Sequence, residues 1–210
     1  MKIAVIQASS QKTKNELLYA CTKKAVDAKG HEVINFGITG KDSNPYSYIQ
    51  TAFLISVLLE CKAVDFVVTG CSSGQGMMLA CNSLPGILCG YVENPSDAFL
   101  FGRINDGNAV SFPLGLQFGW AGEINLQASL DHLFQGPFGC GYPAEDAKRK
   151  QADTKLMKKL NAITKRTLVD ILDELEPDFI KSRLKHEIVF PYICEHGQNQ
   201  PLLEALVRFR

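Results

Sequence analysis

The stretch VVTGCSSGQGMMLACN, residues 67–82, joins a short apolar run to an amphipathic segment through a loop that contains glycine. The run that ends at Gly70 is typical of a strand buried on both faces of a parallel sheet, and the segment from residue 75 onward is typical of a helix. The loop would present backbone N–H groups at the first turn of that helix. The stretch therefore predicts a strand–loop–helix unit whose loop can bind an anion.

The same alternation continues on both sides of this stretch. Residues 37–45 read as a polar loop. Strands are expected at residues 2–7, 31–37, 65–70, 86–92 and 108–112, and helices at 14–30, 46–64, 75–84, 95–105 and 122–134. Strands that alternate with helices predict an α/β fold with a doubly wound, parallel, five-stranded sheet in a Rossmann-like three-layer sandwich. Such sheets bind ligands at the carboxyl ends of their strands, which is where the loop after residue 70 lies.

The composition changes after the glycine- and proline-rich segment GPFGCGYP, residues 136–143. Residues 144–175 are charged and helical in pattern, and a short stretch near 179–184 and a final helix near 202–209 follow. An apolar stripe runs along the first of these segments: Leu156, Leu160, Ile163, Leu168, Ile171 and Leu172. We expect an α/β domain at residues 1–140 and a helical C-terminal extension at 141–210, which docks on the domain or on a partner chain to cover the stripe.

The charge pattern favours a small-molecule ligand. The chain has 22 basic and 22 acidic residues and no long block of like charge, which argues against a nucleic-acid or membrane partner. No apolar segment is long enough to cross a bilayer, and the N-terminal run is too short for a signal peptide, so we expect a cytoplasmic protein. Seven cysteines without a CxxC pair argue against a disulfide framework and a zinc site, and we expect no metal and no cofactor.

Cys71 has two interpretations. A small apolar residue at the end of a buried strand is one of them. The other is a nucleophile or base, because the amides of a glycine loop at a helix N-terminus favour a thiolate. Gly74 and Gly76 allow a close backbone approach and a positive φ. The loop lacks the lysine of a P-loop and the spacing of a GxGxxG motif, so the glycines alone do not decide between the two.

A family resemblance bears on this choice. CSSGQGM followed by MLACN is similar to the CGTGxGM and AxN patterns of the ribose-5-phosphate isomerase B and galactose-6-phosphate isomerase family. Downstream, GRINDGN resembles the family's HNDxN pattern, and the segments MKIAV and GHEVINFG match as well. The resemblance covers roughly residues 1–136. It implies an enzyme that interconverts aldose and ketose phosphates through a cis-enediolate, as a homodimer or homotetramer with the active site at a subunit interface.

The resemblance also implies roles for individual residues. Cys71 would move the proton between adjacent carbons, Ser73 would move a proton between the two oxygens, and Asn105 would bind a substrate hydroxyl or the enediolate. The loop amides would bind the developing oxyanion. The residues that would bind the substrate are Ser9, Ser10, Ser72, Gly74, Gln75, Gly76, Met77, Asn82, Arg103 and Arg149.

Three regions depart from the family pattern. Ile104 stands at the histidine of HND, which is implicated in opening the sugar ring, and isoleucine performs no acid–base catalysis. Ala8 and Ser9 stand at the acid and the histidine of the family's DHAG segment. The arginines that hold the phosphate have no clear match, and the candidates are Lys148, Arg149, Lys12, Lys14 and Arg103.

Other functions stay open on these residues. A non-catalytic sugar-phosphate-binding protein, or the inactive partner subunit of a hetero-oligomeric isomerase, is favoured by Ile104 and Ala8 and opposed by Cys71. A flavodoxin-like nucleotide binder is a third interpretation, because residues 7–14 are rich in hydroxyl groups. Structural roles are open too: Asn82 tying down its own turn, Arg103 pairing with an acid at a subunit contact, and Arg149 on a solvated helix face.

Overall fold

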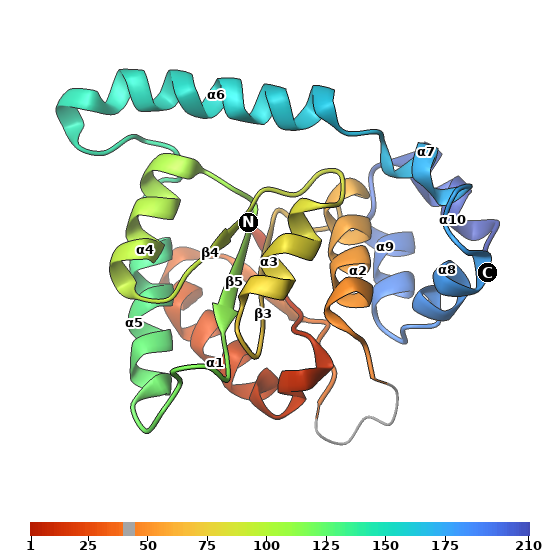
Figure 1. The fold of residues 1–210 in the computed structure, drawn as a ribbon, viewed down its shortest axis with the longest axis horizontal. Coiled ribbons are helices and arrows are strands. Elements are labelled where there is room, and N and C mark those ends of the chain that lie inside the picture. Colours follow the sequence, from red (N-terminus) through yellow and green to blue (C-terminus); the bar gives the residue numbers. More distant parts are fainter. Residues whose placement is uncertain (40–44) are drawn as a thin grey trace.

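A five-stranded sheet, all of whose neighbouring strands are parallel, forms the centre of the computed structural model, which describes residues 1–39 and 45–210 (Figure 1). Residues 40–44, in the polar loop expected at 37–45, lie outside the described residues. The strands are β1 (Lys2–Val5), β2 (Glu32–Asn35), β3 (Phe66–Cys71), β4 (Cys89–Tyr91) and β5 (Ala109–Pro113), in the order β2-β1-β3-β5-β4. The predicted doubly wound α/β fold is confirmed.

Helices cover both faces of this sheet. One face carries α1 (Asn15–Val26), α4 (Pro95–Leu100) and α5 (Gly122–Phe134), whose apolar residues share one core cluster with β1 and β5. The other face carries α2 (Tyr48–Glu60) and α3 (Gln75–Asn82). Short turns of other helix types are Ser9–Lys14, Asp27–Lys29, Phe101–Asn105 and Ala144–Asp146. The first helix pattern ends as expected at Gly30, whose φ of 66° suits glycine.

The C-terminal segment forms five helices within the described residues: α6 (Ala147–Thr164), α7 (Leu168–Leu172), α8 (Pro177–Leu184), α9 (Val189–His196) and α10 (Gln200–Val207). The single helical run expected at 144–175 is interrupted, because Thr167 begins a new helix through a capping box with Asp170. The α9 helix was not expected. Residues of α7 to α10 share a core cluster with α2, which explains why nine consecutive α2 residues are buried.

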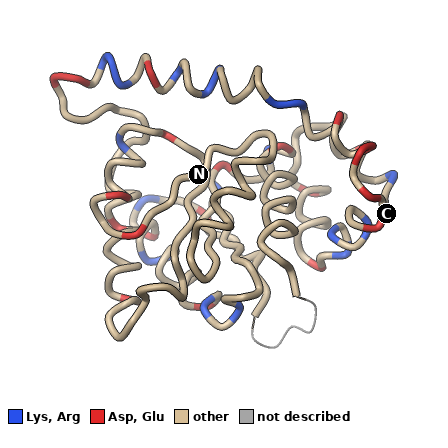
Figure 2. The backbone as a smooth tube through the Cα atoms, viewed as in Figure 1, with Lys and Arg blue, Asp and Glu red and all other residues tan. Residues whose placement is uncertain are grey.

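The α6 helix lies across one end of the molecule (Figure 1) and carries many of its charged residues (Figure 2). Polar contacts join α6 to the segment that precedes β5: Thr154 Oγ1 donates to Ile104 O over 2.7 Å, and Lys158 pairs with Asp106. Of the expected apolar stripe, Leu168 and Leu172 are buried, as predicted for a docked segment. The stripe residues on α6 stay exposed in the single chain: Leu156 at 56%, Leu160 at 47% and Ile163 at 67%.

Two further expectations can be compared with the described residues. None of their helices is both long and apolar enough for a membrane span. Among residues 1–39 and 45–210, no three His, Cys, Asp or Glu side chains gather as a metal site requires. All seven cysteines are free thiols, and five of them are buried.

Candidate active site

A cleft of about 740 Å³ lies between β1 and β3, where the order in which successive strands are added to the sheet reverses. β1 pairs with β2 on one side and with β3 on the other, so the connections that leave β1 and β3 diverge and open a crevice at their carboxyl ends. The cleft is lined by residues that follow β1 and β3 and by residues at the start of α2: Ala8, Ser9, Ser10, Pro45, Tyr46, Ser47, Tyr48, Gln50, Cys71, Ser72, Ser73 and Gly76.

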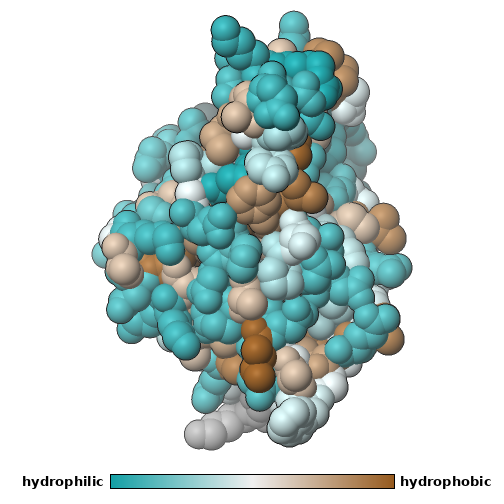
Figure 3. Space-filling view, turned by 90° about the vertical axis from the view of Figure 1, so that its left-hand side faces the viewer, coloured by the Kyte–Doolittle hydropathy of each residue, from teal (hydrophilic) through white to brown (hydrophobic). Residues whose placement is uncertain are grey.

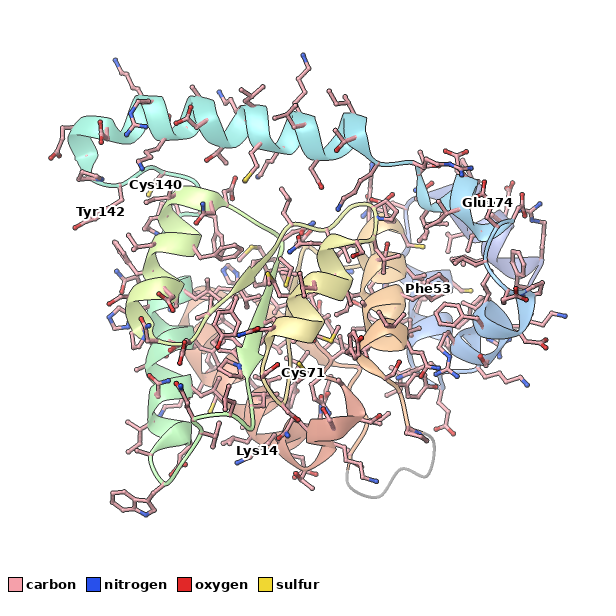
Figure 4. The ribbon with its side chains drawn as sticks, in the orientation of Figure 1. Lys14, Phe53, Cys71, Cys140, Tyr142 and Glu174 are labelled. Atoms are coloured by element: carbon pink, nitrogen blue, oxygen red, sulfur yellow. The ribbon has the colours of Figure 1, made fainter. Side chains whose placement is uncertain are left out.

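Cys71 is the last residue of β3 and lies beside the start of α3 (Figure 4). It is 8% exposed, and it pairs in register with Pro113 of β5. Its carbonyl accepts from the N–H of Leu114 over 2.9 Å. The thiol is therefore carried by a rigid strand and borders the cleft, which is the arrangement that a proton-transfer group needs.

The glycine loop presents the N-terminus of α3. Gly74, with a φ of 75°, precedes the helix, and its carbonyl accepts from Ser111 Oγ over 2.6 Å and from Met78 N–H over 3.1 Å. Because the Met78 bond is the first of the helix, the N–H groups of residues 75–77 precede the intrahelical ladder. The Met77 side chain is fully buried, so only its backbone can serve a ligand. This helix N-terminus suits a negatively charged oxygen.

The serine residues of the cleft differ in how they are engaged. Ser9 Oγ accepts from the N–H of Tyr46, and Ser9 N–H donates to Tyr46 O over 2.9 Å. Ser72 Oγ accepts from Gln11 Nε2 over 3.0 Å. Ser10 is exposed, whereas Ser73 is half-buried, and both line the cleft. These hydroxyl groups can bind the hydroxyl and carbonyl oxygens of a sugar.

Asn82, Arg103 and Arg149 are among the expected site residues that do not line the cleft. Asn82 ties β4 to the end of α3: its Nδ2 donates to Cys89 O over 2.8 Å, and its Oδ1 accepts from Cys89 N–H over 2.9 Å. Arg103 is buried, donates to Leu133 O over 2.9 Å, and its pKa is lowered by this burial. Arg149 lies on the solvated face of α6, 3.1 Å from Asp146 and 3.3 Å from Asp153.

Asn105 and Cys71 of the same chain lie at opposite ends of the parallel strands: Asn105 precedes the amino end of β5, and Cys71 lies beside its carboxyl end. A five-residue strand separates the two ends by about 13 Å. Asn105 is exposed and borders a second cavity, of about 450 Å³, together with Asn82 and Tyr91. Within one chain, the structure does not bring Asn105 to the thiol.

The residues at the start of α2 were missed by the sequence analysis. Tyr46 and Tyr48 form part of the cleft wall, and a Cβ atom on Gly76 would lie 3.7 Å from the Tyr48 ring. The capping box of Ser47 and Gln50 fixes where α2 begins. The pattern Ser-x-x-Gln was readable in the sequence as a helix start, but nothing in it indicated that this start faces the loop after β3.

Comparisons with known proteins agree with this geometry. A family model described as Ribose/Galactose Isomerase matches residues 3–124. The chain is 40% identical to a 4-deoxy-L-threo-5-hexosulose-uronate ketol-isomerase solved with tartrate, with a TM-score of 0.95 over 100% of this chain and 99% of that one. It is 36% identical to a ribose-5-phosphate isomerase from Vibrio parahaemolyticus, with a TM-score of 0.94 over the same shares.

A more distant structure matches only part of this chain. A type B ribose 5-phosphate isomerase from Trypanosoma cruzi is 21% identical, with a TM-score of 0.64, and covers 77% of this chain and 99% of that one. The two nearer structures cover the C-terminal helices as well, whereas this one leaves part of the chain unmatched. A search among curated proteins returned no match.

Proposed function

Because the chain belongs to the ribose/galactose isomerase family, whose members are sugar isomerases, we propose that it interconverts an aldose and a ketose by proton transfer through Cys71. One observation carries this proposal: the thiol borders the same cleft as a row of hydroxyl groups and the N-terminus of α3. A base, an oxyanion site and sugar-binding hydroxyls are the parts that an enediolate mechanism needs.

In this mechanism, the Cys71 thiolate removes the proton from the carbon next to the carbonyl. The electron pair moves onto the carbonyl oxygen, which the N–H groups at the start of α3 stabilise as it becomes an oxyanion. Ser73 passes a proton between the two oxygens, and the thiol returns its proton to the neighbouring carbon. No bond between the protein and the sugar forms, and the atoms and charges balance without a cofactor.

For the substrate, we propose an acidic sugar without phosphate, of the 4-deoxy-5-hexosulose uronate class. The cleft's described lining holds no Lys or Arg, and two of the arginines expected at a phosphate, Arg103 and Arg149, are engaged elsewhere. The relative at 40% identity acts on such a uronate and was solved with tartrate, a hydroxylated dicarboxylate.

The missing histidine fits the same substrate. A 4-deoxy-5-keto sugar has no hydroxyl on C4 or C5, so its aldehyde forms neither of the usual sugar rings. Such a substrate needs no acid or base for ring opening, so Ile104 in place of the family's histidine is compatible with turnover. Ribose 5-phosphate is the second candidate, favoured by the relative at 36% identity.

A substrate panel tests this choice. We expect the purified chain to convert 4-deoxy-L-threo-5-hexosulose uronate with a kcat/KM at least tenfold above that for ribose 5-phosphate, because no described cation lines the cleft for a phosphate. Nuclear magnetic resonance in D₂O would measure turnover and exchange of the proton next to the carbonyl. The reverse order of substrates contradicts the uronate assignment. Exchange with neither compound favours the non-catalytic binding protein.

We also propose that the enzyme is a homodimer or larger and that Asn105 of a second copy completes each site. The exposure of Asn105 at the far end of the strands supports this, since only another chain can bring it to Cys71. Exposed apolar residues on α6 supply the surface that such an assembly would cover. Further apolar side chains gather beneath the protruding end of α6 (Figure 3).

Mixed dimers test the shared site. The Cys71→Ala and Asn105→Ala variants should each have low isomerase activity when expressed separately. A co-expressed mixture of the two should regain about a quarter of the wild-type activity. The reason is that about half of the dimers are mixed, and each mixed dimer has one intact site and one doubly altered site. Native mass spectrometry would count the mixed dimers. If they form without any gain in activity, Asn105 does not act across the interface.

A further inference from the structure

Tyr46 connects the cleft to the C-terminal helices. Its backbone is bonded to Ser9 on the cleft side, and its side chain lies against two residues of the C-terminal segment. The Arg183 guanidinium carbon is 4.6 Å from the centre of the Tyr46 ring, and the His186 ring centre is 5.3 Å from it. Residues far apart in the sequence therefore form one wall, with the C-terminal segment behind the tyrosine.

Arg183 carries a positive charge without an acidic partner among the described residues. Its Nε donates to Ser182 Oγ over 3.3 Å, whereas its Nη1 is buried with no hydrogen-bond partner in that part of the chain. Burial lowers the pKa of this guanidinium from its ordinary value, although an arginine stays charged. Arg183 is half-buried as a residue, but a buried guanidinium nitrogen without a hydrogen-bond partner among the described residues is costly, so its presence calls for an explanation.

Arg166 and Arg208 of the same segment have acidic partners. Arg166 contacts Glu174, and Arg208 lies 3.5 Å from Asp173, both at exposed positions. Arg183 and Arg210 have no acidic partner among the described residues; Arg210 lies against the Phe190 ring, whereas Arg183 lies against Tyr46 of the cleft wall. Arg183 lies in the last turn of α8, where a cation is mildly favourable, but that small effect does not account for the buried, unpartnered Nη1.

We infer that Arg183 supplies the positive charge that attracts the substrate carboxylate to the cleft, acting across the ring of Tyr46 as a positioning residue. This inference rests on the proposed function, and it gives the C-terminal segment a part in substrate choice. Protein atoms separate the charge from the cleft, so its field is weakened less than it would be through water. Because the described lining of the cleft holds no Lys or Arg, Arg183 is the cation on which an acidic ligand depends.

Arg183→Met tests the charge while keeping an apolar stem of similar length. We expect KM for the uronate to rise about tenfold with kcat changed less than twofold, and the dissociation constant of tartrate to rise about tenfold. Arg183→Lys should restore most of both, because it restores the charge. Isothermal titration calorimetry would measure tartrate binding at two salt concentrations. The wild-type affinity should fall at high salt more than that of Arg183→Met.

The matched control is Arg208→Met, which removes an exposed arginine from the same segment and should leave both constants unchanged. Thermal unfolding would detect a merely structural role, in which KM and tartrate affinity stay constant while stability falls. That result overturns the inference, as does a wild-type chain that binds no tartrate. If the wild type binds tartrate in an Arg183-dependent way but isomerises no sugar, the proposed function is wrong. The inference that Arg183 attracts a carboxylate to the cleft is then still supported. If Arg183→Met does not fold, Arg183→Lys and the salt dependence of the wild type decide.

Discussion

Replacing Cys71 by alanine is expected to lower kcat on the true substrate by a factor of about 10² to 10⁴, which is the usual contribution of a positioned base. The thiol ends a strand whose six residues are all buried, and it borders the cleft that the serine hydroxyls line. Alanine leaves the strand and the loop in place, so substrate binding should change little. The loss should therefore appear in kcat, and exchange of the carbon-bound proton with D₂O should fall by the same factor.

A second cysteine provides the control for this result. Cys194 lies on α9, is exposed, and belongs to no part of the cleft, so Cys194→Ala should keep the wild-type rate. Initial rates of both variants would be measured at a temperature at which thermal unfolding shows both to be folded. A Cys71→Ala enzyme that turns over at the wild-type rate would remove the thiol from the mechanism and return it to the role of a buried strand residue.

The fold could be predicted from the sequence because the residue pattern within most helices and strands indicates the type of element. The apolar run before Gly70 and the glycine-terminated helix that ends at Gly30 follow from burial periodicity and backbone conformation alone. The break at Thr167 was missed although a Thr-x-x-Asp capping box marks it, since the apolar stripe continues on both sides of it. The α9 helix was missed too, because it has only eight residues and contains Pro191.

The site was harder to read, because its parts meet only through tertiary packing. The family resemblance predicts that Asn105 binds the same substrate as Cys71, but within one chain the two residues lie at opposite ends of the parallel strands. Arg103 is a candidate for phosphate binding in the sequence, and in the structure it is a buried donor to Leu133 O. Tyr46 and Arg183 carry no motif at all. Their proximity depends on the C-terminal helices folding back onto α2, which no local pattern specifies.

Replacing Gly74 by alanine should both destabilise the protein and damage the site. The residue has a φ of 75°, and an added Cβ would lie 2.7 Å from Tyr91 Cε2 and 2.9 Å from two backbone atoms of β5, Phe112 C and Pro113 N. The left-handed conformation costs about 1–2 kcal/mol for a residue with a side chain, and overpacking adds about 1–3 kcal/mol. Urea unfolding at a fixed protein concentration should therefore show a loss of about 2–5 kcal/mol.

Gly30→Ala separates the two causes, because Gly30 also has a positive φ, of 66°, but nothing lies within 4 Å of its absent Cβ. That variant should lose only about 1–2 kcal/mol and keep full activity. In Gly74→Ala the sheet backbone cannot yield, so the loop itself must move and carry the α3 amides away from the oxyanion. A displacement of about 1 Å is enough to lower kcat/KM by about 10². If the two variants were equally stable and equally active, the loop would not be held in place by its contact with β5, and the oxyanion site would have to lie elsewhere.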